Sequence, residues 1–314
     1  MPIPASFEGR LKIPAVAAPM FLTSGPDLVV EVSRSGMVGT FPALNCRTSE
    51  GFRDWVREIK ARLAAAGDAA PFGVNLIVHK SNPRLEADLA ICAEEQVPLI
   101  ITSLGAVPDL VKVVHAYGGV VFHDVISRRH AEKAAEAGVD GIIAVSAGAG
   151  GHAGSVSPFA LVSEIRQVFA GTILMAGAIN TGAQILAARA AGADLAYMGT
   201  RFIATREAMV QEEFKDMILS SAAADILYTP AISGVNANFL KPSIRAAGLD
   251  PDNLTGHGKL DLNNEVKAWK AIWSAGQGVG GIADLPPAAE LCQRLGAEYH
   301  AALAALAADP FARG

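Results

Sequence analysis

The strongest constraint on the fold is an alternation of short apolar runs with longer segments of helical period, which continues through the first two thirds of the chain. This pattern is typical of parallel strands joined by crossover helices. Eight apolar runs have the length of a strand: Val16–Met20, Met37–Phe41, Phe72–Leu76, Leu99–Thr102, Val120–His123, Gly141–Val145, Thr172–Ala176 and Leu195–Met198. Eight parallel strands close into a filled barrel, so the sequence predicts an α/β protein with a (β/α)8 TIM barrel.

Glycines at the ends of the helical segments support this prediction. Ser35-Gly36, Ala137-Gly138 and Ala191-Gly192 each end such a segment directly before an apolar run. A glycine just past a helix supplies the left-handed cap that turns the chain into the next strand. A doubly wound open sheet is the alternative, but the first run leads into MFLTSGP and not into a G-x-G-x-x-G turn.

The alternation stops after Thr200, and helical stretches mixed with turn-rich pieces follow. We interpret residues 206–264 as an insertion that lies over one face of the barrel. Residues 1–205 and 265–314 are expected to form the barrel itself, with an Ala-rich helix, Pro287–Ala308, returning to its wall.

Composition and charge disfavour several classes of function for this chain. Hydrophobic residues make up 51% of the chain and charged residues 18%, which predicts a compact protein with a large core. A formal charge of −5 without a run of Lys or Arg disfavours nucleic acid as a partner. Three scattered cysteines (Cys46, Cys92 and Cys292) and the lack of a long apolar segment point to the cytoplasm and away from a membrane. No Cys/His cluster or H-E-x-x-H motif occurs, so we expect no catalytic metal.

The loop AVSAGAGGHAG, Ala144 to Gly154, is the most informative stretch. It follows the sixth predicted strand, and in such barrels the loops at the carboxyl-terminal ends of the strands carry the chemistry. A glycine-rich turn with an incidental surface histidine is one interpretation. The functional one makes His152 catalytic, because an imidazole can take a proton from a weak carbon acid or, once protonated, stabilise an anion.

The turns after the seventh and eighth strands, MAGAI and MGTRF, occupy the place where barrels often build a phosphate site from backbone N–H groups. The alternative is that both are tight turns selected for packing. Cys46 has no neighbour that would activate a thiolate, and we interpret it as a small buried residue. His123 either packs at the barrel rim or contacts a ligand, and Asn238 of the insertion is open to both substrate contact and packing.

Together the AP-M start, FGVN, the AGGH-type loop, AGAI, MGTRF and WSAGQGVGGI resemble nitronate monooxygenases, the 2-nitropropane dioxygenase-like family, over nearly the whole chain. The resemblance implies an FMN-dependent barrel with a small, mainly helical substrate-binding domain inserted after the eighth strand. It implies oxidation of alkyl nitronates, in some members nitroalkanes, by O2 to a carbonyl compound and nitrite. The oligomeric state stays open, with a homodimer among the options.

The resemblance also implies which residues form the site, with His152 matching the family's active-site histidine. The isoalloxazine would be lined by Ala18, Pro19, Met20, Asn75 and Thr102, with Gly150 and Gly151 packed near it. The phosphate would be held by Ala176, Gly177, Gly199 and Thr200, and the pocket closed by Gln277 and Gly278. For Gln277, an amide that only stabilises the loop is the alternative.

Two departures from the family pattern leave other functions open. Gly148 stands where many relatives carry Glu or Gln, and Asp124 stands where some carry Lys. Without that Lys the redox tuning of the flavin, and hence the preferred oxidant, is undetermined. The alternative function is an NAD(P)H-dependent FMN reductase that acts on quinones or enoyl thioesters. A flavin- or phosphate-binding protein without turnover is the third option.

Overall fold

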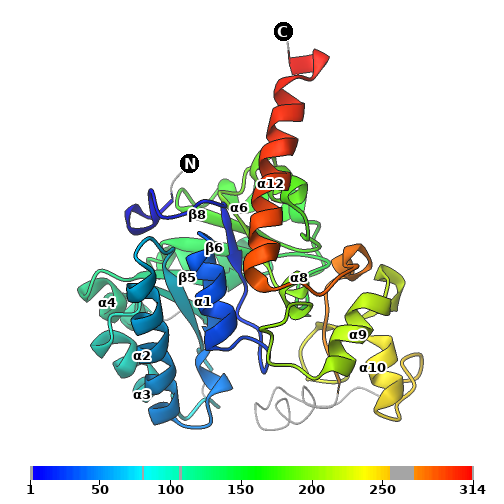
Figure 1. Ribbon diagram of the computed structural model, residues 1–314. Coiled ribbons are helices and arrows are strands. Elements are labelled where there is room, and N and C mark those ends of the chain that lie inside the picture. Colours follow the sequence, from blue (N-terminus) through cyan, green and yellow to red (C-terminus); the bar gives the residue numbers. More distant parts are fainter. Residues whose placement is uncertain (1–2, 80, 106–107, 255–271, 313–314) are drawn as a thin grey trace.

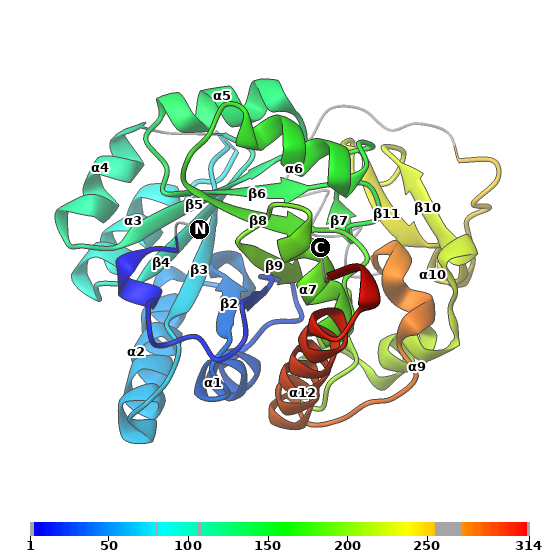
Figure 2. The ribbon, with the colours of Figure 1, turned by 90° about the horizontal axis from the view of Figure 1, so that it is seen from above.

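The computed structural model describes residues 3–79, 81–105, 108–254 and 272–312. Eight parallel strands close into a barrel in the order β1-β2-β3-β4-β5-β6-β8-β9, and β9 pairs with β1 to complete the ring (Figure 2). The strands are β1 (Ala15–Ala17), β2 (Val38–Pro42), β3 (Phe72–Ile77), β4 (Leu99–Ser103), β5 (Val120–Val125), β6 (Gly141–Val145), β8 (Thr172–Ala176) and β9 (Leu195–Met198). The predicted TIM barrel is confirmed. The observed β1 ends before Pro19, because proline has no N–H to continue the strand ladder.

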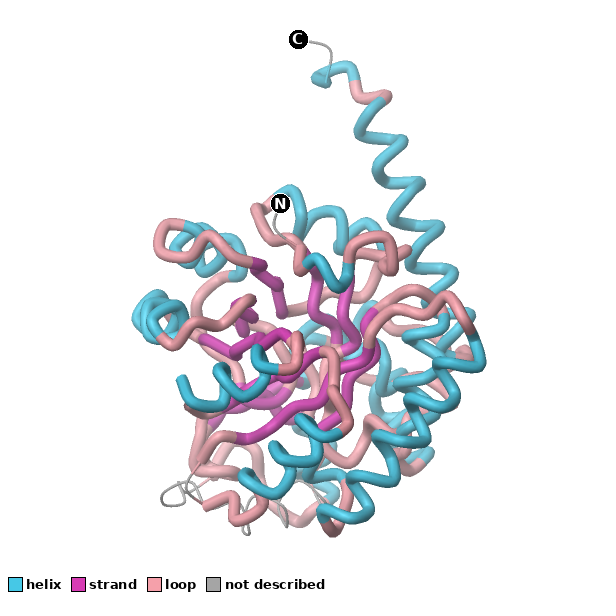
Figure 3. The backbone as a smooth tube through the Cα atoms, turned by 90° about the vertical axis from the view of Figure 1, so that its left-hand side faces the viewer, coloured by secondary structure: helices cyan, strands magenta, loops and turns pink. Residues whose placement is uncertain are grey.

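Helices connect the strands and surround them, as the tube in Figure 3 shows. They are α1 (Pro26–Arg34), α2 (Ser49–Ala66), α3 (Leu85–Glu94), α4 (Pro108–Ala116), α5 (Arg128–Glu136), α6 (Pro158–Arg166), α7 (Gly182–Ala190) and the short α8 (Thr200–Ile203). The predicted caps Gly36, Gly138 and Gly192 have φ values of +85°, +83° and +101°, the left-handed region that favours glycine.

The last long helix, α12 (Ala288–Ala307), confirms the helix predicted over Pro287–Ala308. Its first turns pack against α7 and α1, so it fills the remaining place in the ring of helices. Its carboxyl-terminal part projects beyond the barrel (Figures 1 and 3).

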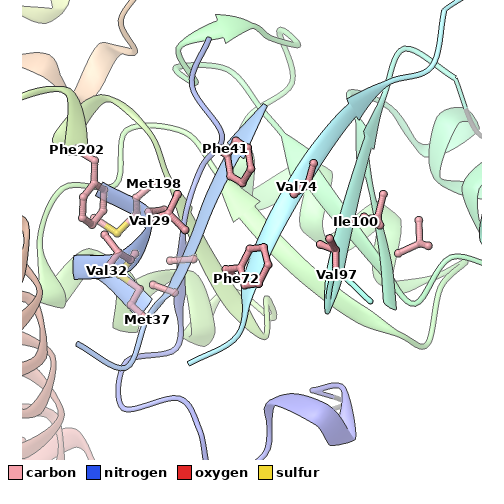
Figure 4. Packing of buried hydrophobic residues seen from close by; sticks show 14 of the residues in the cluster. Val29, Val32, Met37, Phe41, Phe72, Val74, Val97, Ile100, Met198 and Phe202 are labelled. Carbon is pink, nitrogen blue, oxygen red and sulfur yellow. The ribbon is translucent and has the colours of Figure 1, made fainter. Parts of the chain in front are cut away.

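Two apolar layers hold the barrel. Alternate strand residues such as Val74 and Ile100 pack outward against the helices, where Figure 4 shows them with Val29, Phe41 and Phe202. The residues between them face the barrel axis and form an inner cluster, as the two-residue period of a strand requires. Phe7, from the 3-10 helix η1 (Ala5–Phe7), packs against Phe122 of this inner cluster, with ring centroids 5.9 Å apart. The inner core is therefore filled from the amino-terminal side, which leaves the carboxyl-terminal strand ends for a cavity.

The segment after α8 contains α9 (Glu212–Ser220), the 3-10 helix η3 (Ala223–Asp225), β10 (Ile226–Thr229), β11 (Ala237–Leu240) and α10 (Lys241–Ala246). Its antiparallel β10–β11 hairpin was not foreseen in the sequence. β11 also pairs with β7 (Gly151–His152), which belongs to the loop after β6. Residues 255–264 of the predicted insertion lie outside the described residues. The 3-10 helices η4 (Gln277–Gly281) and η5 (Pro310–Ala312) flank α12.

Candidate active site

The carboxyl-terminal ends of the barrel strands open into a cavity of about 1190 Å³. Typical pockets for small ligands and cofactors measure roughly 300–1,000 Å³, so this cavity has room for a cofactor and a substrate together. Loops after the strands form most of its wall. Phe214 and Asn236 of the segment after α8, and Trp273 and Ser274 near the start of the last described stretch, cover it.

All the site residues predicted from the sequence line this cavity except Thr102 and Gln277. Thr102 is buried, and its Oγ1 lies 2.7 Å from Nδ1 of His123. Gln277 is exposed, and its backbone N–H donates to the carbonyl of Gly148 at 2.9 Å. This backbone bond joins the last described stretch to the glycine-rich loop, and both interpretations of the Gln277 side-chain amide stay predictions.

Strand alternation explains the position of Thr102. Along β4, Ser103 faces the cavity together with Asp124 of the paired strand β5, to which it is hydrogen-bonded. Thr102 and His123 alternate with them and form a pair of their own. The cavity extends along α5 towards His130, and His123 lines this extension. Burial lowers the pKa of His123 to about 4, so it is neutral at physiological pH.

His152 lies at the cavity wall in a backbone that two distant segments hold, β11 and the stretch that contains Ser274. Its strand, β7, pairs with β11 through Ala237. Asn238 Nδ2 donates to the carbonyl of Ala149 at 2.7 Å. Ser274 Oγ accepts from the Gly151 N–H and donates to the Asn238 carbonyl, both at 2.6 Å. The glycine-rich loop is thus anchored, and the imidazole is presented from a defined backbone.

A polar group that includes the predicted site residue Asn75 lies at the ends of β3, β4 and β5. Ser103 Oγ donates to Asp124 Oδ2 at 2.5 Å and accepts from Asn75 Nδ2 at 2.8 Å. Burial raises the pKa of Asp124 to about 6, while the Ser103 hydrogen bond and the charge of His152 act in the opposite direction. Tyr197 lines the same region, and burial together with the Asp124 charge raises its pKa well above the ordinary value.

The turns after β8 and β9 form the other end of the cavity. Gly199 has a negative φ, and a Cβ built on it would meet no atom closer than 3.7 Å, so its missing side chain leaves open room at the wall. Thr200 Oγ1 accepts from the Gly276 N–H at 2.8 Å, which joins the last stretch to this end. Gly177 differs, because its φ is +134° and a Cβ would lie 2.5 Å from Ser146 Oγ. Packing alone requires glycine there, whereas Gly199 suits close approach of a ligand.

Cys46 is buried outside the cavity wall, and burial raises the pKa of its thiol to about 12. Within the described ranges, no group of three or more His, Cys, Asp or Glu side chains is arranged to hold a metal ion. No described helix combines the length and apolar character needed to cross a bilayer.

Comparison with known proteins places these features in a family. The family model for nitronate monooxygenase matches residues 81–298. A nitronate monooxygenase of Paraburkholderia phytofirmans is 28% identical over 90% of this chain and 91% of its own length. A 5-hydroxy-7a-methyl-1-oxo-octahydro-1H-indene-4-carboxyl-CoA dehydrogenase of Rhodococcus jostii is also 28% identical, over 74% of this chain and 63% of its own length.

Among solved structures, nitroalkane oxidase from Streptomyces ansochromogenes superimposes with a TM-score of 0.83, covering 96% of this chain and 100% of its own. At 24% sequence identity this likeness supports the fold alone. The family model, in contrast, spans more than two thirds of the chain and includes the His152 loop and both turns at the far end of the cavity. The chain therefore belongs to the nitronate monooxygenase family and is an oxidoreductase of this flavin-dependent family.

Proposed function

We propose that the protein is an FMN-dependent nitronate monooxygenase, which oxidises alkyl nitronates, and nitroalkanes after deprotonation, with O2 to a carbonyl compound and nitrite. The observation that carries the proposal is His152, anchored at the wall of a cavity that is large enough for both a flavin and a small substrate. When bound, FMN would supply the electron acceptor for the substrate.

The residues of the cavity fit this cofactor. Ala18, Pro19, Met20 and Asn75 would line the ring, and Gly150 and Gly151 would lie near it. The open room at Gly199, next to Thr200, would admit a phosphate, together with Ala176, Gly177 and Gly278. Thr102 and Gln277, which lie outside the cavity wall, would support the site indirectly through His123 and Gly148. We propose residues 206–264 as the substrate-binding insertion over this face.

His152 would act on the substrate in one of two ways. Towards a neutral nitroalkane, its neutral imidazole would take the proton from the carbon next to the nitro group. Towards a preformed nitronate, its protonated form would stabilise the anion. Both roles require the ring to stay at the cavity wall, which the hydrogen bonds of Ser274 and Asn238 with the loop favour.

One specific observation favours a second candidate, an NAD(P)H-dependent reductase or dehydrogenase acting on acyl thioesters. The relative from Rhodococcus jostii is named for a carboxyl-CoA substrate. The cavity of this chain also extends beyond the strand ends, along α5 to His130 and Lys133. Such an extension would accommodate a substrate much longer than a simple nitronate.

Anaerobic mixing tests both candidates. The purified yellow protein is mixed without O2 with NADH, NADPH or propyl nitronate in separate cuvettes, and the visible absorbance of the flavin is followed. Loss of absorbance with propyl nitronate supports the proposal, and loss with a nicotinamide alone moves the assignment to the reductase. No change with any of the three would identify a binding protein without turnover. Heat release and chromatography of the cofactor should yield FMN, and recovery of FAD would contradict the cofactor assignment.

A further inference from the structure

The segment after α8 and the last described stretch together form an apolar wall of the cavity, which we define as Ile203, Val210, Phe214 and Trp273. Ile203 belongs to α8, Val210 to the turn that follows and Phe214 to α9. All four pack in one hydrophobic cluster, which continues away from the cavity to the fully buried Ile218. The wall is therefore the inner surface of a packed core and not a set of loosely held side chains.

The two aromatic residues of the wall, Phe214 and Trp273, hold each other in place. Their rings stack with centroids 4.9 Å apart and planes inclined by 16°. The backbone at Trp273 is fixed as well, because its N–H donates to Ser243 Oγ at 2.6 Å and its carbonyl accepts from the Leu240 N–H at 2.9 Å. Aromatic side chains bury a large apolar area on binding. Held in this way, the pair offers a rigid apolar surface to a ligand.

Hydrogen bonds place this wall beside His152. Ser274 follows Trp273 in the chain and accepts from the Gly151 N–H at 2.6 Å, and Gly151 directly precedes His152. From another side, Met20 packs against the same hydrophobic cluster, and Met20 is one of the residues proposed to line the flavin ring. The wall therefore lies next to the place where the reacting carbon of a substrate would meet both groups.

We propose that the apolar wall binds a hydrocarbon substituent of the substrate, so that nitronates with an alkyl chain of several carbons are preferred to the shortest ones. The proposal rests on the proposed function, in which His152 and the flavin define the position of the reacting carbon. The wall carries no charged side chain, so it selects by apolar contact and leaves the anionic nitronate group to other residues. Burial of one methylene group corresponds to a gain of roughly fourfold in affinity.

Calorimetry with anions that do not react tests the wall separately from turnover. Linear carboxylates from acetate to octanoate are titrated into the flavin-loaded protein, because a carboxylate, like a nitronate, is a planar anion with two oxygens. We expect the affinity to rise by roughly two- to fourfold for each added methylene group, with an increasingly negative heat-capacity change. Equal affinities along the series, or no binding of any member, would overturn the proposal.

Variants of the wall should change the gain per methylene group and leave the affinity for acetate near that of the wild type. Phe214→Ala should lower the gain, and Phe214→Leu should restore most of it. Val210→Thr is the milder change, because Val210 is half-buried and threonine has nearly the same size with a polar hydroxyl. Met217→Ala is the matched control, since Met217 of α9 packs against the same cluster but does not line the cavity. An equal loss in Met217→Ala would contradict a direct role of the wall.

The two proposals fail in different ways. A gain along the carboxylate series without turnover of ethyl, butyl or octyl nitronate preserves the apolar site and overturns the proposed function. Turnover with the same kcat/KM for all three nitronates preserves the function and overturns the site. Loss of FMN from Phe214→Ala with an unchanged gain per methylene group would assign the wall to the cofactor, which also overturns the site. If both hold, kcat/KM rises along the nitronate series, and less steeply in Phe214→Ala.

Discussion

At the scale of single residues, His123 and Asp124 are neighbours on β5 that point to opposite sides of the strand and have different partners. His123 and Asp124 both lie in poorly solvated surroundings, and burial disfavours the charged form of each. The pKa of His123 falls to about 4, and that of Asp124 rises to about 6. Each shift changes the free energy of unfolding by roughly 3 kcal/mol over the pH interval between the folded and unfolded pKa values.

The two shifts predict opposing pH dependences of stability. Between about pH 4 and pH 6.5 the unfolded chain holds more protons at His123 than the folded protein does, so stability falls as the pH falls. Between about pH 4 and pH 6 the folded protein holds more protons at Asp124, so stability falls as the pH rises. In the wild type the two contributions largely cancel.

Denaturant titrations of Asp124→Asn should show the free energy of unfolding increasing by roughly 3 kcal/mol from pH 4 to pH 6.5. His123→Gln should show the reverse slope, and parallel curves for all three proteins would refute the assignment.

The second prediction at this scale concerns His152. His152→Ala should retain fold and flavin content, because a residue on a loop of the cavity wall contributes little packing. Turnover of neutral nitroalkane should fall by roughly 10²–10⁴-fold if the imidazole is the base, whereas preformed nitronate should lose less. Steady-state rates on both substrates decide this. Equal losses would show that His152 binds the anion without acting as the base, and wild-type rates on both would remove it from the chemistry.

At the scale of elements, the three-stranded sheet β10-β11-β7 connects the segment after α8 to the barrel loop that carries His152. Asn238 of β11 is 2% exposed, and its amide meets the Ala149 carbonyl. The loop is therefore positioned by residues that are distant in sequence and close in the fold.

Asn238→Ala should disturb this element selectively. It leaves the Ala149 carbonyl without its partner, at a cost of roughly 1–3 kcal/mol. Since the strand ends that surround the proposed cofactor are untouched, flavin content should stay near normal while kcat/KM for nitronate falls. Asn253→Ala is the control, because Asn253 is exposed and its side-chain amide donates to the nearby Asp250. Loss of flavin in parallel with activity would show that the hairpin supports the cofactor site as well.

At the scale of the whole molecule, the barrel depends on a helix that comes from the end of the chain. α12 packs against α7 and α1 through its first half, where Leu295 is 1% exposed, and then leaves the barrel surface (Figure 1). Leu306, on the projecting half of the same helix, is 52% exposed.

These two leucines make a matched pair. Leu295→Ala should lower the free energy of unfolding by roughly 2–5 kcal/mol, because it opens a cavity between α12 and the barrel. Leu306→Ala should stay within roughly 0.5 kcal/mol of wild type. Chemical denaturation followed by circular dichroism measures both. A large loss from Leu306→Ala would mean that the projecting half is covered in solution.

The sequence by itself determined the barrel and most of the cavity wall. Each strand and helix is encoded by a local period of apolar residues, and glycine caps such as Gly36 mark where they meet. Parallel strands then bring their carboxyl ends to one face, which is why the sequence alone predicts residues as distant as Ala18 and Gly199 in one site, and both line the cavity.

Only the tertiary structure decided how the site is held and which side chains enter it. The two-residue strand of His152 has no period to detect, and its supports come from Asn238 and Ser274, 89 and 123 residues away from their partners. Likewise, whether Thr102 or Ser103 meets the cavity depends on the register of β4 in the closed barrel, because a shift of one residue reverses the face. The raised pKa of Asp124 likewise depends on burial at the end of β5, which is a property of the folded chain and not of any local pattern.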